Sequence, residues 1–318
     1  MKRKIIWLRG IFMPCFLCLM GFNVHADALP LDSALSMVRS SCAGISNDLS
    51  GLKKMAGINT AVTAVGTVAG GVALGTGIAK ANVDKEYQEK LNKLIADKSS
   101  EPIEKLEIAD KQKFKQDILN AIRSASQDLS DEEKEITELE QKSKKLGGIR
   151  TGTLAASTVT NVAGTAIAVG NKIDGDLEQK INKCISAVKE LSNAKLAAKV
   201  EDAATAEQID RADKIIANCR DWEFVDLTPV NNRAKGAAVS SGIGIGTGVI
   251  GTITSAVANT DKTRAGDENK EKSLNTTANV MAGASTAASA VATVFNATQI
   301  SAIKKAAVVA DACEGALQ

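Results

Sequence analysis

The chain has 318 residues, with 39 Lys and Arg against 37 Asp and Glu, a formal net charge of +2 and only 3% aromatic residues. A near-neutral chain with charges of both signs has no excess of basic residues for binding nucleic acid. So few aromatic side chains also disfavour base stacking and aromatic-lined ligand pockets. We therefore expect neither nucleic acid nor a small-molecule substrate as a partner.

The N-terminus has the features of a secretory signal peptide. It opens with the basic stretch "MKRK", and a mostly apolar segment follows over residues 11–22. Val24 and Ala26 then place small side chains at positions −3 and −1, so we expect cleavage after Ala26, with Ala28 as the second choice. The alternative is an N-terminal anchor that is retained. Residues 1–26 are thus expected to direct export beyond the cytoplasm, to the cell envelope or to the outside.

Cleavage after Ala26 would change the chemistry available to the chain. It would remove four basic residues and no acidic ones, so that the net charge becomes −2. It would also remove His25, which is the only histidine. Without histidine the chain has no Ser-His-Asp or Cys-His nucleophile and no imidazole ligand for a metal. We therefore expect no catalysis and no cofactor.

The remaining sequence alternates between charged segments and four uncharged runs rich in Gly, Ala, Thr, Ser and Val. These runs cover residues 55–79, 151–171, 236–260 and 273–303. Each is longer than the ~20 residues that cross a bilayer as a helix. The charged segments carry apolar residues three and four positions apart, which is the a/d pattern of packed helices. The sequence thus predicts an all-α fold of antiparallel helical hairpins packed as a bundle.

The first connection between runs, residues 80–150, is long and rich in Lys and Glu. Its acidic stretch at 130–140, "SDEEKEITELE", is the best candidate in the chain for metal ligands. Ser130-x-x-Glu133 is, however, a capping box, and acids in a first helical turn are favoured by the helix dipole. We therefore interpret the stretch as a solvated helix N-terminus and expect no metal.

Four cysteines remain after cleavage, and each lies about four helical turns from the edge of an uncharged run. An even number of cysteines in an exported chain indicates two disulfides. The candidates are Cys42, Cys184, Cys219 and Cys313.

The cysteines and runs also suggest two copies of one plan: Cys, small-residue helix, polar connection, small-residue helix, Cys. The expected organisation is a signal peptide (1–26), an N-terminal helix (27–55), a first hairpin repeat (56–184) with a charged helical insertion (80–150), a connecting hairpin (185–218) and a second repeat (219–318).

Small residues spaced by four recur in the first three runs and would let helix backbones approach closely. The candidate helix-packing glycines are Gly66, Gly70, Gly71, Gly75, Gly148, Gly152, Gly242, Gly244, Gly246 and Gly248. The stretch "SGIGIGTGVIG" at 241–251 also matches the dinucleotide fingerprint G-x-G-x-x-G. That motif needs a strand before it and an acidic residue at the end of a second strand, and neither is present. Helix packing therefore accounts better for a pattern of small residues that several segments share.

The uncharged runs allow two interpretations. Their length and lack of charge favour helices that cross a membrane, while their modest hydrophobicity also fits a water-soluble bundle with an Ala/Gly core. Gly lowers the stability of a soluble helix by up to ~1 kcal/mol relative to Ala, which favours the membrane. If the runs span, all four cysteines fall on one side, and a cleaved signal places that side outside the cytoplasm.

We therefore expect an exported, membrane-associated helical protein that works by helix packing and assembly. Membrane lipid is the expected partner, with self-association or a protein partner in addition. A secreted effector that inserts into a target bilayer or forms pores is the first alternative. A soluble periplasmic bundle that binds partners is the second.

The disulfide pairing can be narrowed to two choices, because neighbours in the sequence are also neighbours in an up-down bundle. The repeat plan favours Cys42–Cys184 with Cys219–Cys313. The local register favours Cys184–Cys219 with Cys42–Cys313, since Cys184 and Cys219 are equally far from a turn near Glu201. One short turn fixes the alignment of its two helices more closely than the long 80–150 connection does. We therefore predict the second pairing.

Overall fold

The structure is a computed structural model that describes residues 29–98, 108–124, 130–260, 263 and 268–318. All regular secondary structure in these residues is helical, which confirms the all-α prediction. The elements are α1 (Leu31–Cys42), α2 (Ile45–Lys98), α3 (Ile108–Ser124), α4 (Asp131–Gly170), α5 (Gly175–Val200), α6 (Ala206–Cys219), the 3₁₀ helix η2 (Arg220–Phe224), α7 (Thr228–Ala258) and α9 (Glu268–Leu317). The expected signal peptide and both of its cleavage sites lie outside the described residues.

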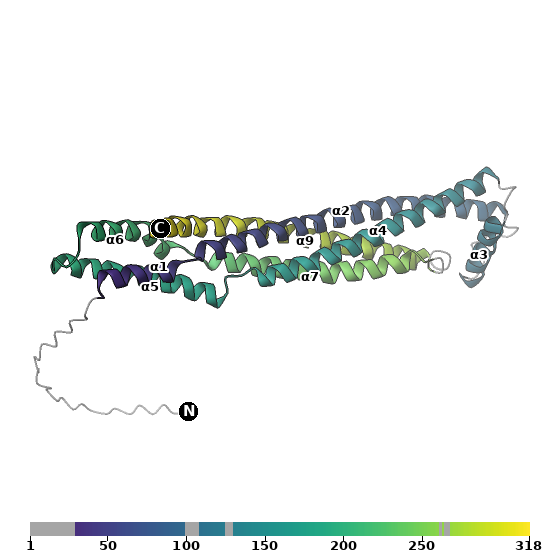
Figure 1. Ribbon diagram of the computed structural model, residues 1–318. Helices are drawn as coiled ribbons and strands as arrows, with labels where there is room; N and C mark the ends of the chain where they lie inside the picture. The colour runs from purple at the N-terminus through teal and green to yellow at the C-terminus, as the bar shows by residue number, and fades with distance from the viewer. Residues whose placement is uncertain (1–28, 99–107, 125–129, 261–262, 264–267) are drawn as a thin grey trace, which may run out of the picture.

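The molecule is a long rod built around four helices, α2, α4, α7 and α9 (Figure 1). These helices pack in the ring order α2–α4–α7–α9, and α9 closes the ring against α2. At one end of the rod, α1, α5 and α6 lie around the C-terminal part of α9, and α3 lies at the other end (Figure 1). With 54 residues, α2 is about 80 Å long, so it extends well beyond a bilayer of ~30 Å.

Apolar cores lie at the two ends of the rod. The larger one, which we call the cysteine end, is built mainly from α1, α5, α6 and the last turns of α9, and it includes all four cysteines. The smaller one lies between α2, α3 and α4 around Leu91 and Ile136. Between them, the buried apolar cluster of the described residues is reduced to Ala73, Leu154 and Ala282. The middle of the bundle therefore has no large apolar core among the described residues.

Local signals explain where several helices begin. Ser130 caps α4, and its backbone N–H donates to Glu133 Oε2 over 2.9 Å in a complete capping box. The hydrogen bond from Lys98 and the bond from the Ser130 backbone hold the pKa of Glu133 below its usual value. Thr205 and Gln208 form the second capping box, at the start of α6. Gly44, with φ of 80°, makes the break between α1 and α2.

Candidate functional site: an inverted helical bundle and its cysteine end

The four central helices expose large apolar side chains along the uncharged runs. Within the described residues, four helical stretches are long and apolar enough to cross a membrane: 31–98, 131–200, 228–258 and 269–317. In the most apolar part of each stretch, only 28–33% of the residues are buried within the bundle. The apolar surface of these helices therefore faces outward.

We call these outward-facing side chains the apolar belt. It comprises Met55, Ile58, Val65, Val68, Val72 and Ile78 of α2, Ile149, Val159, Val162 and Val169 of α4, Val239, Ile243, Val249, Ile250, Ile253 and Val257 of α7, and Val280, Val291 and Val294 of α9. On α2 the belt extends from Met55 to Ile78, which is about 35 Å of helix and close to the thickness of bilayer hydrocarbon.

The interior of the same region is built from small residues and polar side chains. The fully buried polar residues of the uncharged runs, which we call the polar ladder, are Asn59, Thr63, Ser157, Asn161, Ser241, Ser255, Ser285, Ser289 and Asn296, followed by Gln299. All of them except Ser241 take part in hydrogen bonds between helices: Asn59 Nδ2 donates to Asn296 Oδ1 over 3.0 Å, and Ser289 Oγ donates to Asn161 Oδ1 over 3.0 Å. In water such groups gain little by leaving solvent, whereas in lipid they can hold helices together.

The candidate packing glycines divide into two groups. Gly66, Gly70, Gly244 and Gly248 lie directly against a neighbouring helix. A Cβ added at Gly66 would lie 2.6 Å from Thr160 Oγ1, and one added at any of the other three would also collide with a facing side chain. The remaining candidates have no described atom within 4 Å of an added Cβ: Gly71, Gly75, Gly148, Gly152, Gly242 and Gly246.

Sequence reasoning missed several glycines at close contacts. Gly77, Gly147, Gly164, Gly236 and Gly251 each lie where an added Cβ would approach a facing side chain within 3.1 Å. The available signal was the phase of the seam. Buried positions alternate between spacings of three and four along the seam, whereas the G-x-x-x-G motif contains a spacing of four only.

A layer of buried charges closes the bundle at the end of the apolar belt farther from the cysteines. Lys80 is fully buried, and its ammonium contacts Asp84 and lies 3.3 Å from Glu271 Oε1. Ser143 and Asn275 also donate hydrogen bonds to Asp84. The sequence places Lys80 directly after the first uncharged run and Glu271 shortly before the fourth, but it does not show that they meet.

Arg150 completes this charged layer from α4. It is fully buried, and its guanidinium donates to Ser255 Oγ over 2.8 Å, to Asn275 Oδ1 over 2.7 Å and to Asn279 Oδ1 over 3.1 Å. Two cations and two anions, Lys80 and Arg150 with Asp84 and Glu271, therefore share one layer. Their formal charges cancel, which reduces the cost of keeping them out of water.

The cysteine end corrects the predicted pairing. The disulfides are Cys42–Cys184 and Cys219–Cys313, so the prediction of Cys184–Cys219 with Cys42–Cys313 is wrong. Equal distance from the turn placed Cys184 and Cys219 at one level of the bundle but did not decide which neighbour each faces. α5 packs closely against α1, and α6 against α9, and each bridge joins one of these helix pairs.

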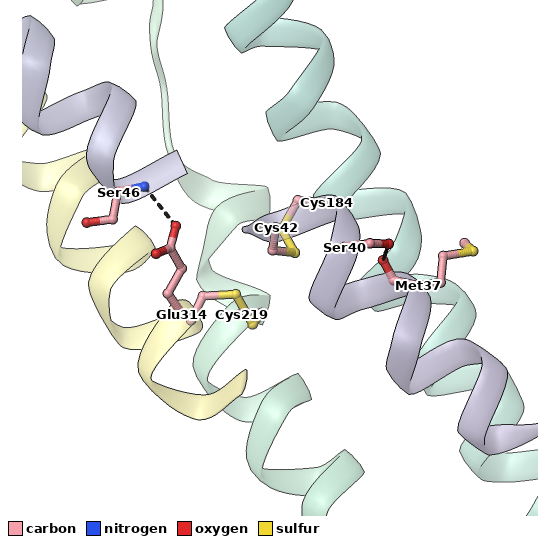
Figure 2. Close-up of a disulfide and its surroundings, with 8 residues drawn as sticks. Met37, Ser40, Cys42, Ser46, Cys184, Cys219 and Glu314 are labelled. Carbon is pink, nitrogen blue, oxygen red and sulfur yellow. Dashed lines mark hydrogen bonds between the residues drawn. A yellow bond between two sulfur atoms is a disulfide. The ribbon is translucent and has the colours of Figure 1, made fainter. Parts of the chain in front are cut away.

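The two disulfides lie beside each other (Figure 2). The Sγ atoms of Cys42, Cys184 and Cys313 all lie within 4.8 Å of one another, and all four cysteines are at most 1% exposed. Further bonds fasten α9 to the break after α1: the Ser46 backbone N–H donates to Glu314 Oε1 over 2.9 Å (Figure 2). Arg39 donates to the Leu317 carbonyl over 2.8 Å.

No protein-family model, curated protein or solved structure matches the chain.

Proposed function

We propose that the chain is an exported protein that resides in a membrane of the cell envelope as a four-helix bundle and acts by helix packing and assembly, without catalysis. One observation carries this proposal: over the length of the apolar belt, apolar side chains face outward and Asn, Ser and Thr face inward. In water this arrangement would leave a large apolar surface exposed. In lipid the same arrangement satisfies both surfaces.

The position of the disulfides is consistent with a bundle that spans the membrane. Both bridges lie beyond one end of the apolar belt, and the charged layer lies at the other end. Because disulfides form outside the cytoplasm, the cysteine end belongs on the outer side of the membrane. The region around α3 then belongs on the opposite side.

Two valines that are equally exposed provide a direct test. Val159 lies in the belt on α4, whereas Val308 lies at the cysteine end on α9, and each is 67% exposed. In a membrane, Val159→Asp would place a carboxylate in hydrocarbon at a cost of about 3 kcal/mol. In water, Val308→Asp is a surface change with an effect within about 0.5 kcal/mol.

The measurement is alkaline extraction of the membrane fraction from cells that express the parent or either variant. We expect the parent and Val308→Asp to resist extraction and Val159→Asp to be extracted or degraded. Equal behaviour of the two variants, or a parent recovered without detergent, would contradict membrane residence.

A secreted protein that inserts into a target bilayer would need the same apolar belt. The extraction experiment therefore includes the culture medium. A soluble parent in the medium that makes liposomes leak would replace our proposal with this alternative. A soluble, inert parent would favour the water-soluble bundle.

A further inference from the structure

A polar cleft opens between α2 and α9 where the apolar belt ends. Its volume is about 480 Å³, and α2 contributes residues from Ala81 to Asn92 to its lining. The last belt residue of α2 is Ile78, and the first belt residue of α9 is Val280. The α9 side of the cleft begins at Asn279 and extends away from the belt.

The cleft therefore lies at the depth of lipid headgroups if the belt is in hydrocarbon. Lys85 is seven residues beyond Ile78 along α2, or about 10 Å, and Lys272 is eight residues before Val280, or about 12 Å. The headgroup regions add roughly 5–8 Å to each side of the hydrocarbon core. Long lysine side chains can span the small remaining difference.

The acidic groups in the cleft already have cationic partners. Asp84 and Glu271 bond to the buried Lys80 of the charged layer. Glu89 is paired with Lys85 at 3.8 Å, but their side chains are 67% and 77% exposed, so this ion pair is weak. Lys272 is also exposed. Lys80 and Arg150 balance Asp84 and Glu271 in the charged layer, so the cleft offers two accessible ammonium groups against one remaining carboxylate, that of Glu89.

A buried amide donor in the cleft wall calls for an acceptor. Gln88 is 7% exposed, and its Oε1 accepts a hydrogen bond from Lys115. Because an ammonium group only donates, the oxygen of this amide must face Lys115. Gln88 Nε2 then has no partner among the described residues. A buried donor without an acceptor costs about 1–3 kcal/mol, and a ligand oxygen recovers it once the enclosed Gln88 amide turns toward the cleft.

We propose that this cleft binds the phosphate group of a membrane phospholipid. Lys85 and Lys272 are the charged donors, and the amide of Gln88 supplies a neutral one. The lipid chains continue along the apolar belt between α2 and α9. This inference rests on the proposed membrane residence, because only then does a phospholipid lie at the level of the cleft.

The test compares probes on the detergent-purified full chain by native mass spectrometry. The probes are dioctanoyl-phosphatidylglycerol, dioctanoylglycerol, which lacks the phosphate, and inorganic phosphate. We expect one tightly bound phosphatidylglycerol and no comparable binding of the other two. Equal binding of dioctanoylglycerol would overturn the phosphate as the recognised group, and equal binding of inorganic phosphate would overturn the lipid as its source.

Paired variants separate the cleft from general attraction to anionic lipid. K85Q/K272Q removes both cleft lysines, whereas K304Q/K305Q removes two exposed lysines of α9 near the opposite end of the belt. We expect the first pair to weaken phosphatidylglycerol binding at least tenfold and the second to leave it within about twofold. Equal affinity of the two double variants would overturn the cleft assignment.

Alkaline extraction of the same variants keeps this inference distinct from the proposed function. If every variant resists extraction but K85Q/K272Q binds the lipid as tightly as the parent, only the cleft assignment fails. If the parent itself is extracted, membrane residence fails.

Discussion

The cysteine end and the central bundle share one packing geometry but differ in the chemistry of their buried residues. Both lie along α9, whose buried residues alternate between spacings of three and four without interruption. In the central bundle, Ala residues alternate with polar ones, as in Ala282, Ser285, Ser289, Ala292 and Asn296. At the cysteine end they are apolar: Ile303, Ala306, Ala310, Cys313 and Leu317.

The seam determines which side chains are enclosed at both places. The proposed membrane residence accounts for the difference in their chemistry. At the cysteine end, burial of Ile and Leu removes apolar area from water and stabilises at roughly 25 cal/mol per Å². In lipid that driving force disappears, because the hydrocarbon outside is as apolar as any core. Close backbone approach and hydrogen bonds between helices then hold the bundle together.

The largest effect that would separate the two regions is loss of the disulfides. The bridges join residues 142 and 94 positions apart, and each should stabilise the folded chain by about 3–5 kcal/mol. Reduction of the detergent-solubilised protein should therefore open α1, α5 and α6 to proteolysis. The polar ladder does not depend on the bridges, so α2, α4 and α7 should stay protected between the ends of the belt.

Hydrogen exchange read by mass spectrometry measures both regions in one sample. A chain that loses protection in the central bundle at the same reductant concentration would show that the two regions are one cooperative unit. The two parts of α9 would then differ in composition only.

The next largest effect concerns the charged layer. Arg150→Met leaves Asp84 and Glu271 opposed by Lys80 alone, and an unbalanced buried charge costs about 3–5 kcal/mol. We expect Arg150→Met to lower clearly the denaturation midpoint in detergent, measured by circular dichroism. Adding Glu271→Gln to Arg150→Met restores the formal balance and should recover part of the loss.

Arg211→Met at the cysteine end is the matched control, because Arg211 is exposed and its replacement should change stability by no more than about 0.5 kcal/mol. Equal midpoints for Arg150→Met and Arg211→Met would show that the charged layer contributes nothing to the bundle.

A smaller effect distinguishes two adjacent glycines in the belt region. An Ala at Gly70 would force its Cβ against Thr286, including the Thr286 Cα at 3.2 Å, whereas Gly71 faces no described atom within 4 Å. We expect Gly70→Ala to destabilise the bundle by about 1–3 kcal/mol through overpacking. Gly71→Ala should be neutral, or stabilising by up to ~1 kcal/mol through helix propensity. Thermal unfolding in detergent compares the two variants directly, and equal shifts would contradict the assignment of faces.

Gly70 and Gly71 also show how far the sequence could lead. The all-α fold, the capping box at Ser130 and the presence of two disulfides follow from local sequence signals, and the structure confirms them. The face on which a glycine lies depends on the phase of the whole seam. Gly66 and Gly70 are in phase with Asn59 and Thr63, and Gly71 is one position out of phase.

Partners across the bundle were beyond the reach of the sequence for a different reason. Lys80 and Arg150 flank the uncharged runs, but whether such residues meet depends on which helices are neighbours. The disulfide pairing was mistaken on the same ground, because level along the rod was predicted and adjacency around it was not. Adjacency is a tertiary property that single-helix periodicity does not contain.

The smallest effect is expected in the pairing of the cysteines. Two variants lose the same disulfide, but each leaves a different cysteine as a free thiol. In Cys219→Ser the free thiol is Cys313, whose Sγ lies within 4.8 Å of both sulfurs of the other bridge. In Cys313→Ser the free thiol is Cys219, which is not part of that close trio. Both variants should lose similar stability, so a difference between them reports position alone.

The expected chemistry is thiol–disulfide exchange in the Cys219→Ser variant. The Cys313 thiolate attacks the Sγ of Cys42 or Cys184, forms a new disulfide there and releases the other cysteine as a thiolate, so no oxidant is consumed. Cys313 is at most 1% exposed, and this burial will slow the step because the thiol must first ionise. Peptide mapping without reduction should therefore find a minor Cys313-linked product in Cys219→Ser and Cys42–Cys184 alone in Cys313→Ser. Identical maps would show that the two disulfides, though adjacent, are held too rigidly to exchange.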